Sequence, residues 1–233
     1  RCYFHSPLFL QRIDLYELSV FWLYLYCYLW ISGMEEKLKQ QPANIVKVVL
    51  FGPESTGKST LSELLARHYN TVWVHEYARE YLQDKWNNQR KTCEQKDLLP
   101  IAIGQMSLEN KLAKKADKIL ICDTDLLETK VYSEEYYGGF VDPDLDRAAT
   151  ESQYDLYLLS YIDTPWEADD LRDRPAQREE MFRAFERALV NNQRPYVILK
   201  GRVKERMNTA VQAIDKILAS KANLDAYSDK LTH

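Results

Sequence analysis

Apolar and polar residues alternate along most of this chain in two different rhythms. Short apolar runs separate longer segments in which apolar residues recur every three or four positions. The short runs predict strands at residues 45–51, 71–74, 118–123, 154–162 and 196–199. The longer segments predict helices that begin at residues 58 and 126 and helices that span 98–116, 178–190 and 204–219. Strands that alternate with helices in this way are typical of a parallel sheet in an α/β domain.

The two ends of the chain do not follow this rhythm. Residues 1–43 include Val20–Ile31, an apolar stretch rich in tryptophan and tyrosine that is shorter than the roughly 20 residues needed to span a bilayer. We expect the catalytic unit at residues 44–220, preceded by upstream translated sequence or a weakly ordered extension. Residues 221–233 are expected to form a polar, frayed tail. A membrane-associated aromatic helix within the N-terminal extension is the alternative.

The composition of the chain limits which kinds of partner it can bind. The chain has 233 residues and a net charge of −4, whereas general nucleic-acid binders carry basic stripes that neutralise phosphates. We therefore expect no nucleic-acid partner, and any anion site must be local. The four cysteines show no zinc-binding spacing and the four histidines are scattered. These patterns predict reduced thiols, a cytoplasmic location without stable membrane insertion, and no metal cluster of cysteine and histidine.

Residues 52–59, Gly-Pro-Glu-Ser-Thr-Gly-Lys-Ser, follow the first predicted strand and precede the first predicted helix. They fit the G-x-x-x-x-G-K-[ST] pattern of a phosphate-binding loop (P-loop), in which backbone N–H groups and a helix N-terminus face phosphate oxygens. Gly52 and Gly57 permit the tight turn and the close approach of the backbone. We expect Lys58 to reach the β- and γ-phosphates of ATP and the Ser59 hydroxyl to bind Mg²⁺. A glycine-rich turn with an exposed lysine is the alternative.

Acidic residues follow the second and third predicted strands, at the sheet edge where α/β proteins bind ligands. Asp123 ends a short apolar strand, as a Walker B carboxylate does, and we expect it to hold Mg²⁺ beside Ser59. Glu76 is placed to face the γ-phosphate, although it could equally open a helix and pair with Arg79. Asp125 either serves the site or caps the helix that follows it.

Arg172, Arg174 and Arg178 follow the fourth predicted strand, and we interpret them as a lid. A mobile arginine that closes over the γ-phosphate stabilises the charge that spreads over its oxygens during phosphoryl transfer. The alternative is a solvated helix with ion pairs four residues apart, which fits Arg178 better than the other two.

Two further groups of residues are candidates for a substrate pocket. Gln105 and Glu109 lie one turn apart on a predicted helix, although an exposed helix face accounts for them better. Tyr136 and Tyr137 precede a glycine turn, where their rings could stack on a flat base, although tyrosines at a helix end more often pack. Residues 86–96 are polar, which favours a surface loop.

The order of these elements is that of the nucleoside and nucleotide kinase branch of P-loop proteins, whose five-stranded sheet commonly has the order 2-3-1-4-5. More closely, residues 44–220 resemble the ribosylnicotinamide kinase domain of the NadR family. The resemblance rests on Gly-Pro-Glu-Ser-Thr-Gly-Lys-Ser-Thr at 52–60, Glu-Tyr-Ala-Arg-Glu-Tyr at 76–81, Asp-Thr-Asp at 123–125, Tyr-Gly at 137–138, and Asp-Thr-Pro-Trp at 163–166 with Arg172. It implies a three-layer P-loop NTPase fold, α/β in class, with helices on both faces of the sheet and an arginine-bearing lid.

The resemblance implies transfer of the ATP γ-phosphate to the 5′-hydroxyl of nicotinamide riboside, which gives nicotinamide mononucleotide. The implied cofactors are ATP and Mg²⁺, with Ser59 and Asp123 as metal ligands. We assign catalysis to Lys58, Glu76, Asp123, Arg172 and Arg174. We assign the nucleotide to Gly52, Glu54, Ser55, Thr56, Gly57, Lys58, Ser59, Thr60, Arg178 and Gly201. We assign the acceptor to Glu76, Tyr77, Arg79, Asp125, Tyr137 and Trp166.

The sequence also departs from the family. Regulator-type members carry an upstream DNA-binding segment and an adenylyltransferase domain, and residues 1–43 are too short for either. We therefore expect a stand-alone kinase that binds a small-molecule nucleoside, and a homo-oligomer is compatible with the sequence. Some members have tryptophan at the position of His75, where it is suited to stacking on the nicotinamide ring. The residues that would stack instead are Trp73, Trp166, Tyr77 or Tyr137.

Three choices stay open at this level. Either Glu76 or Asp123 would orient or deprotonate the 5′-hydroxyl. A kinase of another nucleoside or deoxynucleoside would share every phosphate-side feature and differ only in its base pocket. A P-loop ATPase that acts on a protein partner would turn over ATP without a small acceptor. A nucleotide-binding module without catalysis is disfavoured by Asp123 and the arginine lid.

Overall fold

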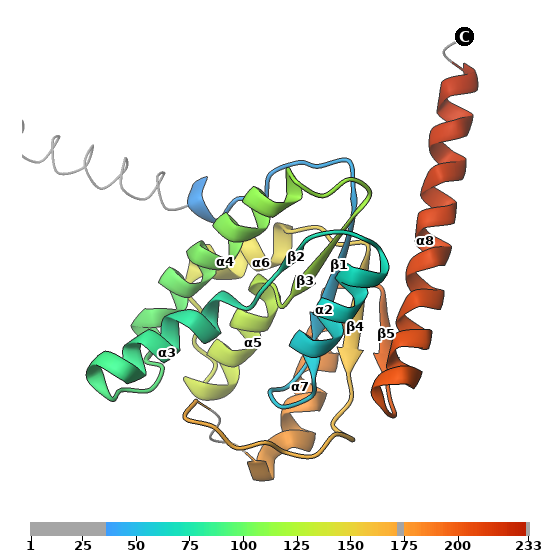
Figure 1. The fold of residues 1–233 in the computed structure, drawn as a ribbon. Coiled ribbons are helices and arrows are strands. Elements are labelled where there is room, and N and C mark those ends of the chain that lie inside the picture. Colours follow the sequence, from blue (N-terminus) through green and yellow to red (C-terminus); the bar gives the residue numbers. More distant parts are fainter. Residues whose placement is uncertain (1–35, 172–174, 232–233) are drawn as a thin grey trace, which may run out of the picture. The chain divides into compact units, whose positions relative to one another are not determined.

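The computed structural model describes residues 36–171 and 175–231. A parallel sheet with the strand order β2-β3-β1-β4-β5 forms its centre (Figure 1). Its strands are β1 (Val46–Phe51), β2 (Trp73–Val74), β3 (Ile119–Asp123), β4 (Leu156–Ser160) and β5 (Tyr196–Leu199). The predicted sheet order is confirmed. Strands β2 and β4 are shorter than the predicted ranges 71–74 and 154–162.

Helices connect the strands. They are α2 (Lys58–His68), α3 (Tyr77–Gln89), α4 (Leu98–Ala113), α5 (Leu126–Tyr136), α6 (Pro143–Glu151), α7 (Arg178–Asn191) and α8 (Val203–Leu231), with short 3₁₀ turns at Gln95–Asp97 and Pro175–Gln177. Within the described residues, no helix is both long enough and apolar enough to cross a bilayer.

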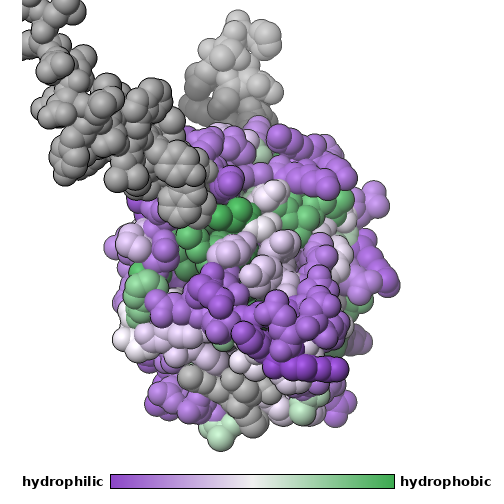
Figure 2. All heavy atoms as spheres, turned by 90° about the vertical axis from the view of Figure 1, so that its left-hand side faces the viewer, coloured by the Kyte–Doolittle hydropathy of each residue, from purple (hydrophilic) through white to green (hydrophobic). Residues whose placement is uncertain are grey.

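Three helical segments differ from the predictions. The predicted loop at 86–96 is wrong in its first part, because α3 continues to Gln89. The polar residues that suggested a loop lie on the exposed side of α3. The face of the molecule that Figure 2 shows is largely polar. Helix α6 was not predicted, although Asp142 caps its first turn and proline follows the cap. The expected frayed tail is helical, because α8 runs on to Leu231.

The sheet has a hydrophobic core on each face, because β1 is buried along its whole length and its side chains alternate. Val46, Val48 and Leu50 pack against residues of α2 and α8. Val49 and Phe51 pack against residues of α4, α5 and α7. The predicted three layers, with helices on both faces of a sheet, are confirmed.

A charged pair lies inside this core. Lys47 of β1 is 6 % exposed, and its Nζ lies 2.9 Å from Oε1 of Glu109 on α4, which is 1 % exposed. The Tyr154 hydroxyl donates to Oε2 of Glu109 at 2.7 Å. A buried lysine needs such a partner because an unpaired charge is costly in the interior. The prediction that Glu109 lies on an exposed helix face is therefore wrong. Glu109 is also not among the residues that line the cavity described below.

Gln105, one turn earlier on α4, is also buried, which corrects its predicted exposed position. Its side-chain oxygen accepts a hydrogen bond of 2.8 Å from the backbone N–H of Tyr77. This N–H group lies in the first turn of α3, where backbone N–H groups have no hydrogen-bond partner within the helix. Gln105 thus fixes the start of α3, the helix that follows Glu76.

Candidate active site

The loop between β1 and α2 has the backbone of a phosphate cradle. Gly52 has φ of 127°, and a Cβ atom there would lie 3.0 Å from the carbonyl oxygen of Ser160, so no other residue fits without movement. Gly57 has φ of 79° and caps α2. Ser55, which is not glycine, has φ of 57°, a conformation that is uncommon for residues other than glycine. The loop is therefore held in the geometry that a P-loop requires.

The outer side of this loop is tied to other elements. The carbonyl oxygen of Ser55 accepts hydrogen bonds from Thr164 Oγ1 at 2.9 Å and from Arg178 Nη2 at 3.2 Å. The carbonyl oxygen of Thr56 accepts one from Arg206 Nη1 at 2.9 Å. These partners hold two loop carbonyls away from the phosphate side. Arg178 therefore supports the loop and does not form the solvated ion-pair helix that was the alternative.

Arg206 of α8 is a site residue that the sequence did not indicate. It is buried and also bonds Tyr161 O, Gly201 O and the carboxylate of Asp163. It thereby joins the ends of β4 and β5 to the P-loop. The backbone N–H of Gly201 donates to Asp163 Oδ2 at 2.6 Å, so Gly201 belongs to this support.

Lys58 lies among three carboxylates. It is 8 % exposed; its Nζ donates to Gly52 O at 2.6 Å and lies 3.1 Å from Glu128 Oε1. Burial opposes a charged lysine, but the negative charges of Glu128, Glu76 and Asp123 raise the pKa of Lys58 above its ordinary value. Lys58 therefore stays protonated, as a phosphate ligand must.

Asp123 ends β3 and is buried. Burial, and then the nearby charge of Glu76, raise the pKa of Asp123 to about 7, while Lys58 and the Ser59 hydroxyl oppose the rise. Both carboxylate oxygens are shielded from solvent without a hydrogen bond of good geometry. A shielded carboxylate beside a hydroxyl suits Mg²⁺, which prefers oxygen ligands.

Glu128 of α5 is the second residue that sequence reasoning missed. It is 2 % exposed, and burial raises its pKa to about 8, although Lys58 opposes this rise. The one signal in the sequence was its position three residues after Asp125, whose carboxylate accepts a hydrogen bond from Glu128 N. That spacing marks the start of a helix and does not identify a partner for a lysine.

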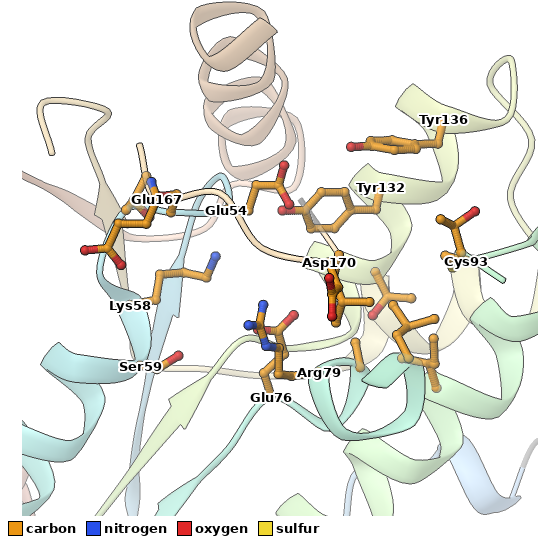
Figure 3. A pocket seen from close by; sticks show the side chains of 18 of the residues that line it. Glu54, Lys58, Ser59, Glu76, Arg79, Cys93, Tyr132, Tyr136, Glu167 and Asp170 are labelled. Carbon is orange, nitrogen blue, oxygen red and sulfur yellow. The ribbon is translucent and has the colours of Figure 1, made fainter. Parts of the chain in front are cut away.

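A cavity of about 470 Å³ opens beside these residues. In Figure 3 Lys58 and Ser59 stand at one side of it, Glu76 and Arg79 lie between, and Cys93 lies at the opposite side, with Tyr132 and Tyr136 on α5. The predicted residues that line it are Glu54, Ser55, Thr56, Gly57, Lys58, Ser59, Thr60, Glu76, Arg79 and Tyr137. Those not predicted include Leu82, Thr92, Cys93, Leu98, Ile101, Thr129 and Tyr132.

Three predicted acceptor residues are not among those that line the cavity. Asp125 is buried, accepts a 2.7 Å hydrogen bond from the Tyr157 hydroxyl and caps α5. The ring of Tyr77 packs against Gly104. Trp166 lies under the guanidinium of Arg178, with 5.7 Å between Cζ and the ring centroid.

Two predicted lid residues, Arg172 and Arg174, lie outside the residues that the structure describes. The segment before them is close to the P-loop, because Glu167 N donates to Ser55 Oγ at 2.8 Å. It also reaches α3, where Arg79 Nη2 lies 2.6 Å from Asp169 Oδ2. This segment therefore connects the P-loop to α3.

Comparison with known proteins agrees with this geometry. The AAA_28 family, described as an AAA domain, matches residues 47–206. The trifunctional NAD biosynthesis/regulator protein NadR of Salmonella typhimurium is 31 % identical over 150 residues, which are 64 % of this chain and 36 % of that protein.

Two solved structures of NadR are also similar. The structure of NadR in complex with NR has a TM-score of 0.63 at 25 % identity and covers 74 % of this chain and 51 % of that chain. The structure of NadR in complex with NAD and AMP-PNP has a TM-score of 0.60 at 25 % identity, with 74 % and 49 % covered. This chain thus spans about half or less of the length of these relatives.

Proposed function

The chain belongs to the AAA_28 family of AAA domains, and from its similarity to NadR and the cavity beside its P-loop we propose that it is a kinase that transfers the ATP γ-phosphate to the 5′-hydroxyl of nicotinamide riboside. The product is nicotinamide mononucleotide. The observation that carries the proposal is the cavity, which extends from the P-loop lysine, Lys58, past the carboxylate of Glu76 to a partly apolar and aromatic wall. The similarity to NadR, a relative solved with NR and with AMP-PNP, supports both substrates.

On the phosphate side, the loop backbone and Lys58 bind the phosphate chain of ATP. Ser59 and Asp123 fit as ligands of Mg²⁺, because a hydroxyl stands next to a shielded carboxylate. Bound Mg²⁺ supplies positive charge against the developing charge on the phosphate oxygens. Arg172 and Arg174 remain our prediction for the closing arginines.

Between the two candidate bases we favour Glu76 for the acceptor hydroxyl. Glu76 lines the cavity, whereas Asp123 is not among the lining residues and lies beside Ser59. Glu76 also precedes α3, so the bond between Gln105 and Tyr77 N fixes its place. Its carboxylate would orient the 5′-hydroxyl and accept its proton at Oε1 or Oε2.

Phosphorylation of a panel of candidate acceptors tests the proposal directly. The full chain is incubated with γ-labelled ATP and, in turn, nicotinamide riboside, deoxyadenosine, deoxycytidine, thymidine or no acceptor. We expect nicotinamide riboside to be phosphorylated at least tenfold faster than the others, and Lys58→Ala to lose about a hundredfold or more of that rate. Preference for a deoxynucleoside would favour the alternative kinase. ATP turnover that ignores every acceptor would favour an ATPase.

The roles of the two carboxylates are separable by kinetics. Asp123→Asn is expected to raise the Mg²⁺ concentration needed for half-maximal rate. Glu76→Gln is expected to lower kcat about a hundredfold with little change in the KM for ATP. If both variants kept turnover within a few-fold of the parent, the catalytic assignment would be wrong.

A further inference from the structure

The side of the cavity opposite the P-loop is closed by a short connection between α3 and α4. Residues of this connection and of the neighbouring helices line the cavity there: Leu82, Thr92, Cys93, Leu98, Ile101 and Tyr137. Figure 3 shows Cys93 on the far side of the cavity from Lys58 and Ser59. We call residues 92–97 the end wall.

One buried lysine attaches the end wall to α3. Lys85 Nζ donates to Glu94 Oε2 at 2.7 Å and to Asp97 Oδ2 at 2.5 Å. The side chains of Lys85 and Asp97 are 7 % and 5 % exposed. A buried charge is costly unless it is paired and hydrogen-bonded. Loss of the lysine would therefore leave Asp97 buried without its cation and would free the end wall from α3.

Further bonds give the end wall a fixed shape. Glu94 N donates to Asp97 Oδ2 at 2.7 Å, which closes a capping box at the 3₁₀ turn. The Tyr81 hydroxyl donates to Asp97 Oδ1 at 3.2 Å, and the Tyr137 hydroxyl donates to Cys93 O at 3.0 Å. The end wall is thus connected to α3 on one side and to the end of α5 on the other.

This attachment has a consequence for the acceptor. If its 5′-hydroxyl is at the P-loop side, the position of the end wall limits how far the base can extend. The helix residues at this end, Leu82, Leu98 and Ile101, are apolar, and the Tyr137 hydroxyl is engaged by Cys93 O. A bicyclic base extends further from the ribose than a single ring does, so a fixed wall at this end favours the single ring.

We propose that Lys85 is a positioning residue that sets acceptor specificity, because it fixes the end wall and so restricts the site to nucleosides with a single-ring base. The inference rests on the proposed nucleoside kinase function. Lys85 is not among the residues that line the cavity, and it acts through Glu94 and Asp97.

The test compares Lys85→Met with Lys96→Met. Lys96 Nζ lies 3.0 Å from the same Glu94 Oε2 but its side chain is 72 % exposed, so it is a matched control. The ratio of kcat/KM for nicotinamide riboside to that for inosine is measured at saturating ATP. In Lys85→Met we expect this ratio to fall at least tenfold while the KM for ATP stays within twofold. In Lys96→Met we expect no change.

The accessibility of the end wall can also be measured chemically, without any acceptor. Cys93 is half-buried, and its alkylation by iodoacetamide is followed by peptide mass spectrometry. We expect Lys85→Met to be alkylated at Cys93 several-fold faster than Lys96→Met. If the parent phosphorylates no nucleoside, the proposed function fails, while equal alkylation rates overturn the role of Lys85 by themselves.

Other outcomes also bear on the proposed role of Lys85. An unchanged selectivity ratio in folded Lys85→Met overturns the proposal, and so does an equal loss of affinity for ATP, which would indicate general damage. If Lys85→Met does not fold, Glu94→Ala, which removes one of the two carboxylates that Lys85 binds and does not line the cavity, must lower the same ratio. An unchanged ratio in Glu94→Ala would then overturn the proposal.

Discussion

Lys58 Nζ and Glu128 Oε1 lie 3.1 Å apart, with both side chains almost fully buried. The lysine that is expected to bind phosphate is therefore already paired with a carboxylate. Binding of ATP requires Lys58 to exchange this partner, or to share it, with a phosphate oxygen. Glu128 thus competes with the nucleotide for the lysine and adds negative charge near an anionic ligand.

We predict that Glu128→Gln binds ATP more tightly than the parent. Neutralising Glu128 removes both the competition for Lys58 and part of the repulsion of phosphate. The expected fall in Kd is roughly three- to tenfold, which corresponds to about 0.7–1.4 kcal/mol. Titration calorimetry with a non-hydrolysable ATP analogue measures it at pH 9, where Glu128, with a pKa of about 8, is ionised.

The control for this prediction is Glu134→Gln. Glu134 lies on the same helix, where its Oε1 is 3.8 Å from Lys130 Nζ, and it is not among the residues that line the cavity. Its replacement should leave Kd unchanged. Weaker binding in Glu128→Gln would show that the pair organises Lys58 for phosphate and does not compete with it.

Asp123 makes stability depend on pH. Its pKa is raised to about 7, whereas an aspartate in the unfolded chain has a pKa near 3.9. Between these values the folded state binds more protons than the unfolded state, so this contribution to stability is complete below about pH 4 and is lost as pH rises through about 7. Glu128, with a pKa raised to about 8, acts in the same direction at slightly higher pH.

We therefore predict that Asp123→Asn is less sensitive to pH than the parent. Urea unfolding without nucleotide or Mg²⁺, at pH values from 5 to 8, gives the free energy of unfolding of each protein. The parent should lose more stability over this range than the variant. Equal slopes would mean that Asp123 ionises normally in the folded state.

The sequence was sufficient for the parts of the site that depend on local patterns. The P-loop and the strand ending in Asp123 follow from short-range spacing, whereas the strand order was implied by the resemblance to nucleoside and nucleotide kinases. The site residue Glu76 was predicted because strand ends define one edge of the sheet. The sequence alone did not favour a catalytic role of Glu76 over opening a helix and pairing with Arg79; the position of Glu76 in the lining of the cavity supports the catalytic role.

The parts that were missed depend on contacts between distant segments. Arg206 reaches Thr56 across 150 residues, and no local pattern marks an arginine within a helix as a partner of a loop carbonyl. Glu109 seemed exposed because its helix is polar at that position, but its partner Lys47 lies inside a strand. Tertiary pairing of this kind overrides the pattern of a single element.

Arg79 and Asp169 are predicted to act together on the acceptor. Their ion pair of 2.6 Å joins α3 to the segment that crosses the P-loop, and Arg79 lines the cavity. Arg79 is 45 % exposed, so the pair contributes at most about 1 kcal/mol to stability. We expect Arg79→Ala and Asp169→Asn each to raise the acceptor KM several-fold with little change in Tm.

The double variant distinguishes a joint role from two separate ones. If the ion pair is what matters, the double variant should raise the acceptor KM no more than either single variant does. Effects that multiply would indicate that Arg79 contacts the acceptor independently of Asp169. Steady-state kinetics at two salt concentrations supply the control, because salt weakens an exposed pair.

Gly104 of α4 leaves room for Tyr77. A Cβ atom at position 104 would lie 2.1 Å from the Tyr77 ring, so the ring and the start of α3 would have to move. Alanine is a better helix former than glycine by about 1 kcal/mol, but the overlap costs about 1–3 kcal/mol. We expect Gly104→Ala to lower Tm and to raise the acceptor KM, because Tyr77 follows Glu76 directly.

The sign of the Gly104 effect should reverse when the ring is absent. In a Tyr77→Ala background the added Cβ meets no ring, and only the gain in helix propensity remains. Gly104→Ala should then raise Tm, and urea unfolding of the four proteins gives the coupling free energy between the two positions. If Gly104→Ala changed Tm equally in both backgrounds, the packing of Tyr77 on Gly104 would not be what positions the start of α3.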